Sequence, residues 1–171
     1  MTGALMGWRA AYLLAAFGLY MVDQASKAWA VRSLRFGQTK TLISGLLALE
    51  YAENRGIAFG QLQEGGAFGR WFLVVLAIAA AISVLFYFFR TPRSDDRVLG
   101  ACALLLAGIA GNLTDRARLG YVVDFILLHL GSYHWPTFNV ADASICAGAL
   151  LLAYDLFFEK RKSGVRSQES E

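Results

Sequence analysis

The stretch WFLVVLAIAAAISVLFYFF, residues 71–89, decides the class of this protein because it contains no charged residue. A helix needs about 20 apolar residues to cross the roughly 30 Å hydrocarbon layer of a membrane, and this stretch is nearly that long. Arg90 and Pro92 follow it directly, and a proline does not continue a helix. Residues from about 70 to 89 are therefore predicted to form a transmembrane helix.

Three further predominantly apolar stretches are also predicted to span the membrane, at about residues 9–26, 97–115 and 137–158. The first imitates a secretory signal peptide, because an Ala-Trp-Ala sequence at 28–30 follows the apolar run. An uncleaved helix is the simpler interpretation, since Asp23 and Lys27 separate the run from that site. We therefore expect an all-α membrane protein with four transmembrane helices, in which residues 1–171 form a single integral membrane domain.

The overall composition supports a membrane protein and excludes several other classes. Hydrophobic residues make up 57% of the chain and charged residues 17%, against roughly 45–50% and about 25% in soluble domains. Disordered and low-complexity fibrous proteins need polar or strictly biased sequences, so both classes are excluded. The net charge of +3 indicates no nucleic-acid partner, because the 16 Lys and Arg residues lie mostly at the ends of apolar runs.

Two connecting segments are expected to lie on one face of the membrane. The segment at about 31–69 is rich in glycine and contains β-compatible pieces such as TLISGLLALEYA. It predicts a small strand-rich or irregular cap. The segment at about 121–136, YVVDFILLHLGSYHWP, is too short to cross the membrane and return. Its aliphatic and aromatic residues are typical of an interfacial segment in the aromatic belt.

Basic residues in short flanks predict the orientation, because Lys and Arg collect on the cytoplasmic side. With four spans, one face carries Arg9, Arg90, Arg93, Arg97, Lys160, Arg161, Lys162 and Arg166. That face is predicted to be cytoplasmic and to hold both termini. The opposite face also carries basic residues, and we interpret some of these as functional rather than topological.

Two predicted helical faces carry polar residues, although an ionisable group at the bilayer centre costs about 2.5–3.5 kcal/mol on insertion scales. The face of the third span carries Gly108, Asn112, Asp115 and Arg116. The face of the fourth span carries Asn139, Asp142, Cys146 and Ala149. Gly108 allows another helix to approach closely. The polar ends of both faces are expected at the outer end of the bundle.

Asp124 and Asp142 are the candidate catalytic pair, because both are expected at the outer end of the bundle, at the same depth in the membrane. Two carboxyl groups brought close together do not easily both ionise, so the pair shares a proton. One member then activates water as a base while the other donates a proton, as in aspartic proteases. The structural alternatives are a loop carboxylate in water for Asp124 and a helix-terminal charge for Asp142.

The neighbouring polar residues have structural alternatives as well. A salt bridge to Arg116 that closes a helix end would explain Asp115, and a hydrogen bond between helices would explain Asn112. Asp23 and Lys27 lie at i and i+4 in the favourable order for a helical ion pair.

No metal site and no cofactor are predicted. His129 and His134 have no metal-ligand partners at a suitable spacing, and we interpret Cys102 and Cys146 as small core residues. The sequence contains no Gly-x-Ser-x-Gly, Walker A or His-Glu-x-x-His motif, which removes the commoner serine, nucleotide and zinc chemistries.

Four sequence blocks, taken in order, resemble the lipoprotein signal peptidase family, signal peptidase II. They are DQASK at 23–27, ENRGIAF at 53–59, GIAGNLTDRARLGYVVDF at 108–125 and FNVADASICAG at 138–148. The resemblance runs from about residue 22 to residue 156, and the order, spacing and membrane placement of the blocks are together highly specific.

The resemblance implies an aspartyl endopeptidase of the bacterial plasma (inner) membrane with its active site at the outer face. Such enzymes remove signal peptides from diacylglyceryl-modified prolipoproteins, cutting just before the lipidated cysteine. The implied fold has four transmembrane helices, a small β-cradle and an interfacial helix on the outer face. The implied partners are prolipoproteins, membrane lipids and the inhibitor globomycin.

The resemblance also assigns roles to individual residues. The catalytic aspartates would be Asp124 and Asp142. The residues facing the substrate or inhibitor would be Asn54, Asn112, Arg116 and Asn139. The residues that support the fold would be Asp23, Lys27 and Asp115. We add Gly108 to this group, because its helical spacing places it on the polar face of the third span.

Two rival hypotheses come from other functional classes. A small membrane transporter or proton-coupled channel would use the buried carboxylates as a relay, which needs polar residues across the whole bilayer. The inner halves of the predicted spans from residue 70 onward are apolar, which disfavours a relay. A non-catalytic assembly factor would be favoured if both Asp124 and Asp142 proved replaceable.

Overall fold

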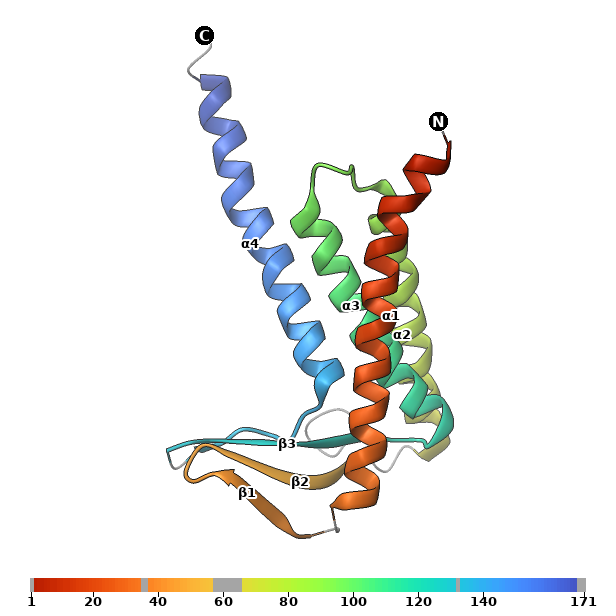
Figure 1. The fold of residues 1–171 in the computed structure, drawn as a ribbon, viewed down its shortest axis with the longest axis vertical. Coiled ribbons are helices and arrows are strands. Elements are labelled where there is room, and N and C mark those ends of the chain that lie inside the picture. Colours follow the sequence, from red (N-terminus) through yellow and green to blue (C-terminus); the bar gives the residue numbers. More distant parts are fainter. Residues whose placement is uncertain (1, 35–36, 57–65, 132, 169–171) are drawn as a thin grey trace.

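The computed structural model of the chain describes residues 2–34, 37–56, 66–131 and 133–168. In chain order its elements are α1 (Thr2–Ser33), β1 (Thr39–Ile43), β2 (Leu47–Asn54), α2 (Gly66–Arg90), α3 (Asp96–Arg118), β3 (Val122–Leu130), β4 (Tyr133–His134) and α4 (Val140–Gln168). The long helices stand on a small sheet that lies across one end of the bundle, and both termini lie toward the other end (Figure 1). The protein is therefore mostly helical, with one small antiparallel sheet.

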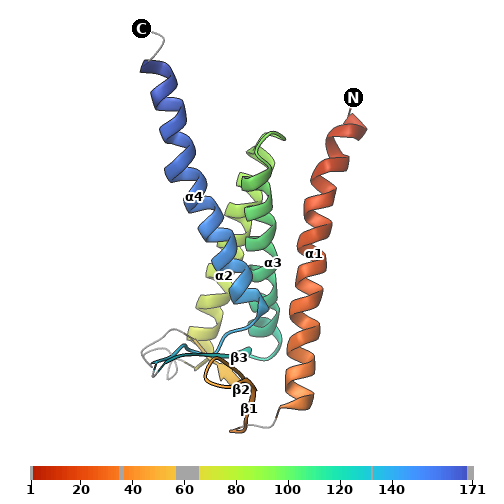
Figure 2. The ribbon, with the colours of Figure 1, turned by 60° about the vertical axis from the view of Figure 1, so that its left-hand side comes forward.

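The sheet has the strand order β1-β2-β3-β4, and all neighbouring strands are antiparallel. Turning the molecule shows the same sheet at the foot of the helices, so it caps the bundle (Figure 2). Between β2 and β3, Ala52 pairs with Asp124 and Asn54 pairs with Val122. This register brings the end of β2, which lies in the predicted cap, next to Asp124.

The structure shows what the segment 121–136, predicted to be interfacial, forms. Most of its described residues belong to β3 and β4. Strand β3 is hydrogen-bonded to β2 along much of its length, from Val122 opposite Asn54 to Leu128 opposite Leu47. These bonds satisfy the polar backbone groups of the segment.

The helix α3 is the centre of the bundle, because it contacts α1, α2 and α4. Two glycines allow α4 to lie against it. A Cβ atom at Gly108 would overlap the carbonyl oxygen of Ala141, and one at Gly148 would lie 2.8 Å from the carbonyl oxygen of Ala101. Small residues at such a crossing allow two backbones to approach closely. The crossing places the polar end of α3 beside the first turn of α4.

Three of the described helices are long and apolar enough to cross a membrane: Phe68–Arg90, Asp96–Arg118 and Val140–Phe158. In the first of these, large apolar side chains such as Val75, Ile82 and Phe86 are 62–63% exposed. So much exposed apolar surface is unfavourable in water, but it is stable in contact with lipid chains. The chain is therefore a membrane protein, as the sequence predicted.

Candidate active site

The two candidate catalytic aspartates lie at the junction of the sheet and the helices. Asp124 is on β3 and is only 1% exposed, while Asp142 is in the first turn of α4 and is partly exposed. The positive end of a helix dipole lies at its N-terminus and stabilises a negative charge there. The two carboxyl groups therefore occupy different environments, one buried at the sheet and one at a helix start.

Asn139 joins the two aspartates. Its side-chain Nδ2 donates to Asp124 Oδ1 at 2.6 Å, and its backbone N–H donates to Asp142 Oδ2 at 3.3 Å. In return, the backbone N–H of Asp142 donates to Asn139 Oδ1 at 2.9 Å. This reciprocal pair has the geometry of a capping box, in which the residue before a helix and the third helical residue cap each other. The capping of α4 therefore also places one residue in contact with both carboxyl groups, Asp124 through its side chain and Asp142 through its backbone.

Two more asparagines each hold one of the aspartates. Asn112 Nδ2 on α3 donates to Asp142 Oδ1 at 2.7 Å, and Asn54 Nδ2 at the end of β2 donates to Asp124 Oδ2 at 3.0 Å. All the polar residues predicted to face a substrate, except Arg116, therefore hydrogen-bond directly to the aspartates. Hydrogen bonds to a carboxylate both orient it and stabilise its charge.

The environment of Asp124 favours its protonated form. Burial and the nearby negative charge of Asp142 raise the pKa of the Asp124 carboxyl from 3.8 to about 6, although hydrogen bonds from Asn54 and Asn139 act in the opposite direction. Desolvation and a like charge both disfavour a second negative charge in one site. Asp124 therefore keeps its proton to a higher pH than an ordinary aspartate does.

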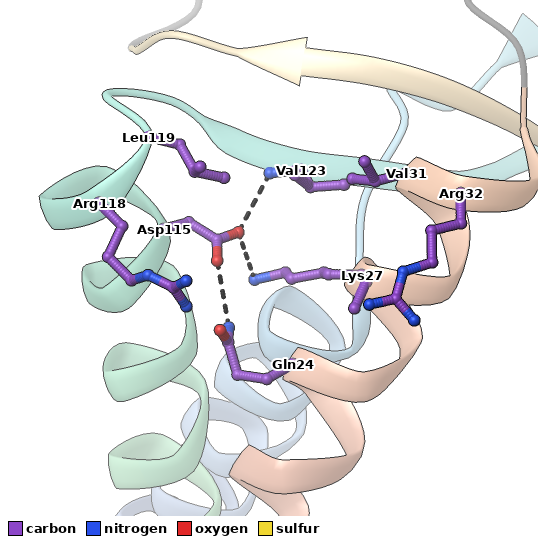
Figure 3. Close-up of a pocket in the computed structure, with 9 residues that line it drawn as sticks. Gln24, Lys27, Val31, Arg32, Asp115, Arg118, Leu119 and Val123 are labelled. Carbon is purple, nitrogen blue, oxygen red and sulfur yellow. Dashed lines mark hydrogen bonds and ion pairs between the residues drawn. The ribbon is translucent and has the colours of Figure 1, made fainter.

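The residues predicted to support the fold lie close to Asp124 and Asp142, on α1 and α3. Lys27 Nζ on α1 forms ion pairs with Asp23 Oδ2 at 2.9 Å and with Asp115 Oδ2 at 3.0 Å. Asp115 thus has Lys27 as its ion-pair partner, where the sequence had offered Arg116. Figure 3 shows Lys27 and Asp115 among the residues that line a cavity of about 340 Å³ between α1 and α3.

Sequence reasoning missed Gln24, which lines the same cavity. Its Nε2 donates to Asp23 Oδ2 and to Asp115 Oδ1, both at 3.1 Å. The signal was present, since Gln24 is a polar residue between Asp23 and Lys27 in a predominantly apolar helix. Its partner on α3 becomes visible only when the two helices are packed together.

Arg116 lies within electrostatic reach of Asp142, Asp124 and Asp115. Its Nε is buried, and no hydrogen-bond partner for that atom lies among the residues the structure describes.

His129 and His134 face each other across β3 and β4 with ring centroids 4.6 Å apart. Within the described ranges, no group of three or more His, Cys, Asp or Glu side chains is placed to hold a metal ion.

This arrangement is chemically suited to acid–base catalysis on a carbonyl compound. One carboxyl group of Asp124 and Asp142 accepts a proton from water while the other donates a proton to the developing oxyanion. The asparagine amides fix the carboxylates in advance, which reduces the reorganisation that the reaction requires.

The sequence pattern of the family described as Signal peptidase (SPase) II matches residues 15–158 of the chain. A lipoprotein signal peptidase of Cellvibrio japonicus is 39% identical over 153 residues, which cover 89% of this chain and 89% of that protein. A lipoprotein signal peptidase of Geobacter sulfurreducens is 40% identical over 146 residues, which cover 85% of this chain and 90% of that protein.

Two solved structures have the same fold. Both are described as bacterial membrane enzymes determined by the in meso method, at 2.3 Å and 1.9 Å resolution, and each superposes with a TM-score of 0.79 at 28% identity. They cover 88% and 87% of this chain, which in turn covers 90% and 94% of theirs. Sequence and fold agree over most of the chain, so this protein belongs to the signal peptidase II family.

Proposed function

We propose that this protein is an intramembrane aspartyl endopeptidase that removes signal peptides from diacylglyceryl-modified prolipoproteins, cutting just before the lipidated cysteine. Family membership and the names of the relatives support this function. The observation that carries the mechanism is the contact of Asn139 with both Asp124 and Asp142, because it brings two carboxyl groups to one place.

In the proposed reaction, a water molecule between the two carboxyl groups attacks the scissile carbonyl carbon. Asp142, at the positive end of α4, accepts a proton from that water. Asp124, whose raised pKa keeps its proton available, donates that proton to the carbonyl oxygen. Collapse of the tetrahedral intermediate breaks the C–N bond, and the leaving nitrogen takes a proton from the pair.

The substrate peptide is proposed to bind against the polar end of α3 and α4. Asn54 and Asn112 each retain a side-chain N–H for substrate backbone, because an amide carries two N–H groups and one of them is used among the described residues. Asn139 is fully buried and already donates to Asp124, Val123 and Asn112, so its role is to hold this group in place. Arg116 is the basic residue of this group. The acyl chains of the substrate remain in the lipid, which orients the peptide before the reaction.

We propose that α1 is a fourth transmembrane helix. Its 32 residues extend about 48 Å at 1.5 Å per residue, more than the hydrocarbon layer requires. Its buried ionisable residues, Asp23 and Lys27, pair with each other, which lowers the penalty of placing them at membrane depth.

In the proposed topology, both termini are cytoplasmic and the sheet and the aspartates face the outside of the bacterial inner membrane. Single cysteines at Gln38 and Ser167, in a background with Cys102 and Cys146 changed to Ala, test this. A membrane-impermeant maleimide should label position 38 in intact cells and position 167 only after lysis. Labelling of position 167 in intact cells would contradict the topology and, with it, the peptidase function.

The decisive test of function is to incubate the purified protein with a diacylated prolipoprotein and measure the shortened product by mass spectrometry. We expect the new N-terminus to be the lipidated cysteine, and we expect globomycin to block the reaction. The same precursor without its diacylglyceryl group is the matched control and should be cleaved poorly. No product from the diacylated precursor would contradict the proposal.

A further inference from the structure

Lys27 is a buried cation that contacts three acceptors on two helices. Besides Asp23 on its own helix and Asp115 on α3, its Nζ donates to Asn112 Oδ1 at 3.1 Å. Lys27 is only 3% exposed, so these partners replace water around its ammonium group. An ammonium group has three N–H donors, and each has an acceptor here.

Each carboxylate partner of Lys27 also holds a backbone N–H immediately before one of the candidate catalytic aspartates. Asp23 Oδ1 accepts from the backbone N–H of Ala141 at 2.8 Å, and Ala141 precedes Asp142. Asp115 Oδ2 accepts from the backbone N–H of Val123 at 3.1 Å, and Val123 precedes Asp124. Figure 3 shows the second of these bonds next to the Lys27 contact.

A third connection runs from Lys27 to Asp142 through a side chain. An ammonium group only donates hydrogen bonds, so Asn112 must turn its oxygen toward Lys27. Its Nδ2 is then turned to Asp142, where it donates at 2.7 Å. Lys27, together with Asn139, whose Nδ2 donates to the same oxygen at 3.3 Å, thereby turns the Nδ2 of Asn112 toward Asp142.

From these contacts we propose that Lys27, with Asp23 and Asp115, is a clamp that sets the relative position of Asp124 and Asp142. Lys27 is a positioning residue in this proposal, because it contacts neither Asp124 nor Asp142 directly. The inference rests on the proposed function, since it concerns the pair that would carry out peptide hydrolysis.

General fold support does not account for this arrangement. A buried ion pair is weak support for stability, because the penalty for removing two charges from water offsets much of their attraction. An apolar contact would join α1 and α3 more simply. The clamp instead links α1 to the starts of β3 and α4, which are the two elements that carry the aspartates.

The test compares Lys27→Met with the unaltered protein, measuring kcat and KM for a diacylated prolipoprotein and the thermal unfolding midpoint. We expect kcat to fall by roughly 100-fold with KM changed little, because small displacements of catalytic groups have effects of this size. Thr114→Val is the matched control. It removes another polar contact between α1 and α3, from Tyr20 to Thr114 at 3.3 Å, without touching the clamp, and should keep the kcat of the unaltered protein.

Lys27→Met leaves two buried carboxylates without their cation, so a second variant covers a failure to fold. The triple change Asp23→Asn, Lys27→Met and Asp115→Asn removes all three charges and keeps similar shapes. It should fold and still show the loss of kcat, because Asn112 loses the charged donor on its oxygen and the weaker amide acceptors at positions 23 and 115 hold Ala141 and Val123 less firmly. A kcat equal to that of the unaltered protein in either folded variant would overturn the clamp.

Amide hydrogen exchange tests the clamp independently of any activity. In Lys27→Met or the triple variant, exchange at Val123 and Ala141 should become faster than in the unaltered protein, and in Thr114→Val it should not. Unchanged exchange at both amides would overturn the clamp even if the protein is a peptidase. Faster exchange in a chain that cleaves no prolipoprotein would support the clamp and contradict the proposed function instead.

Discussion

Two pairs of carboxylates lie at the same end of this bundle, and they differ in what joins them. Asp23 and Asp115 are bridged by the ammonium group of Lys27. Asp124 and Asp142 are bridged by Asn139, whose neutral side-chain amide donates to Asp124 and whose backbone N–H donates to Asp142. A cation between two carboxylates stabilises both negative charges, whereas an amide leaves a proton to be shared. The first pair is therefore suited to holding the structure and the second to exchanging protons.

The largest expected effect comes from the second pair. Asp124→Asn and Asp142→Asn should each reduce cleavage of a diacylated prolipoprotein below detection, because an amide keeps the shape but does not exchange the proton. Both variants should remain folded and inserted in the membrane, as judged by yield and thermal unfolding. More than a few per cent of the original activity in either variant would remove that residue from the catalytic pair.

Substitutions in the first pair, Asp23 and Asp115, should lower the stability of the protein. Asp23→Ala removes one partner of a buried ion pair and the acceptor of the Ala141 N–H, so the free energy of unfolding should fall by about 3–5 kcal/mol. Thermal unfolding in detergent measures the change. The surface pair of Glu53 and Arg55 offers the control, since Glu53→Gln should change stability by less than about 1 kcal/mol. Equal effects of both substitutions would remove the distinction between buried and exposed pairs.

Asn112 lies between the two pairs, with its oxygen on Lys27 and its amide nitrogen on Asp142. Asn112→Ala should weaken binding of substrate or globomycin by about 1–3 kcal/mol, the effect of one unsatisfied polar partner, with a smaller loss of thermal stability than Asp23→Ala. Isothermal titration with globomycin checks the first value. A profile like that of Asp23→Ala would assign Asn112 to the structural pair.

The last expected effect, spread over about two pH units, is in the pH dependence of stability. The pKa of Asp124 is raised in the folded protein to about 6, so the folded state binds a proton more tightly than the unfolded chain does. Its contribution to stability is therefore present below about pH 4 and is lost as the pH rises to about 6, at up to about 1.4 kcal/mol per pH unit.

Asp124→Asn is the reference for this measurement, because it removes the titrating group. Subtracting its free energy of unfolding from that of the unaltered protein, between pH 4 and pH 7, should give a difference that declines up to about pH 6 and is flat above. A flat difference over the whole range would show that Asp124 is no more protonated in the fold than in the unfolded chain.

The sequence alone predicted the membrane class and the family. The apolar run at 71–89 needed no tertiary information, because hydropathy and length determine whether a helix prefers lipid. The polar faces around Asn112 and Asp142 were also predictable, since residues at helical spacing share one face whatever they pack against. The strands within 121–136 were not predicted, because local patterning does not reveal the pairing with β2 that satisfies that backbone.

Only the tertiary structure decided how the polar residues are paired. The sequence offered Arg116 as the partner of Asp115, but the packing of α1 on α3 supplies Lys27. The backbone N–H groups of Val123 and Ala141 are present in every fold of this chain, and nothing in their side chains indicates that they bind Asp115 and Asp23. The sequence determined which helices prefer lipid because that preference depends on composition. The assignment of partners depends on distances between elements up to 118 residues apart, which exist only once the helices and the sheet are packed together.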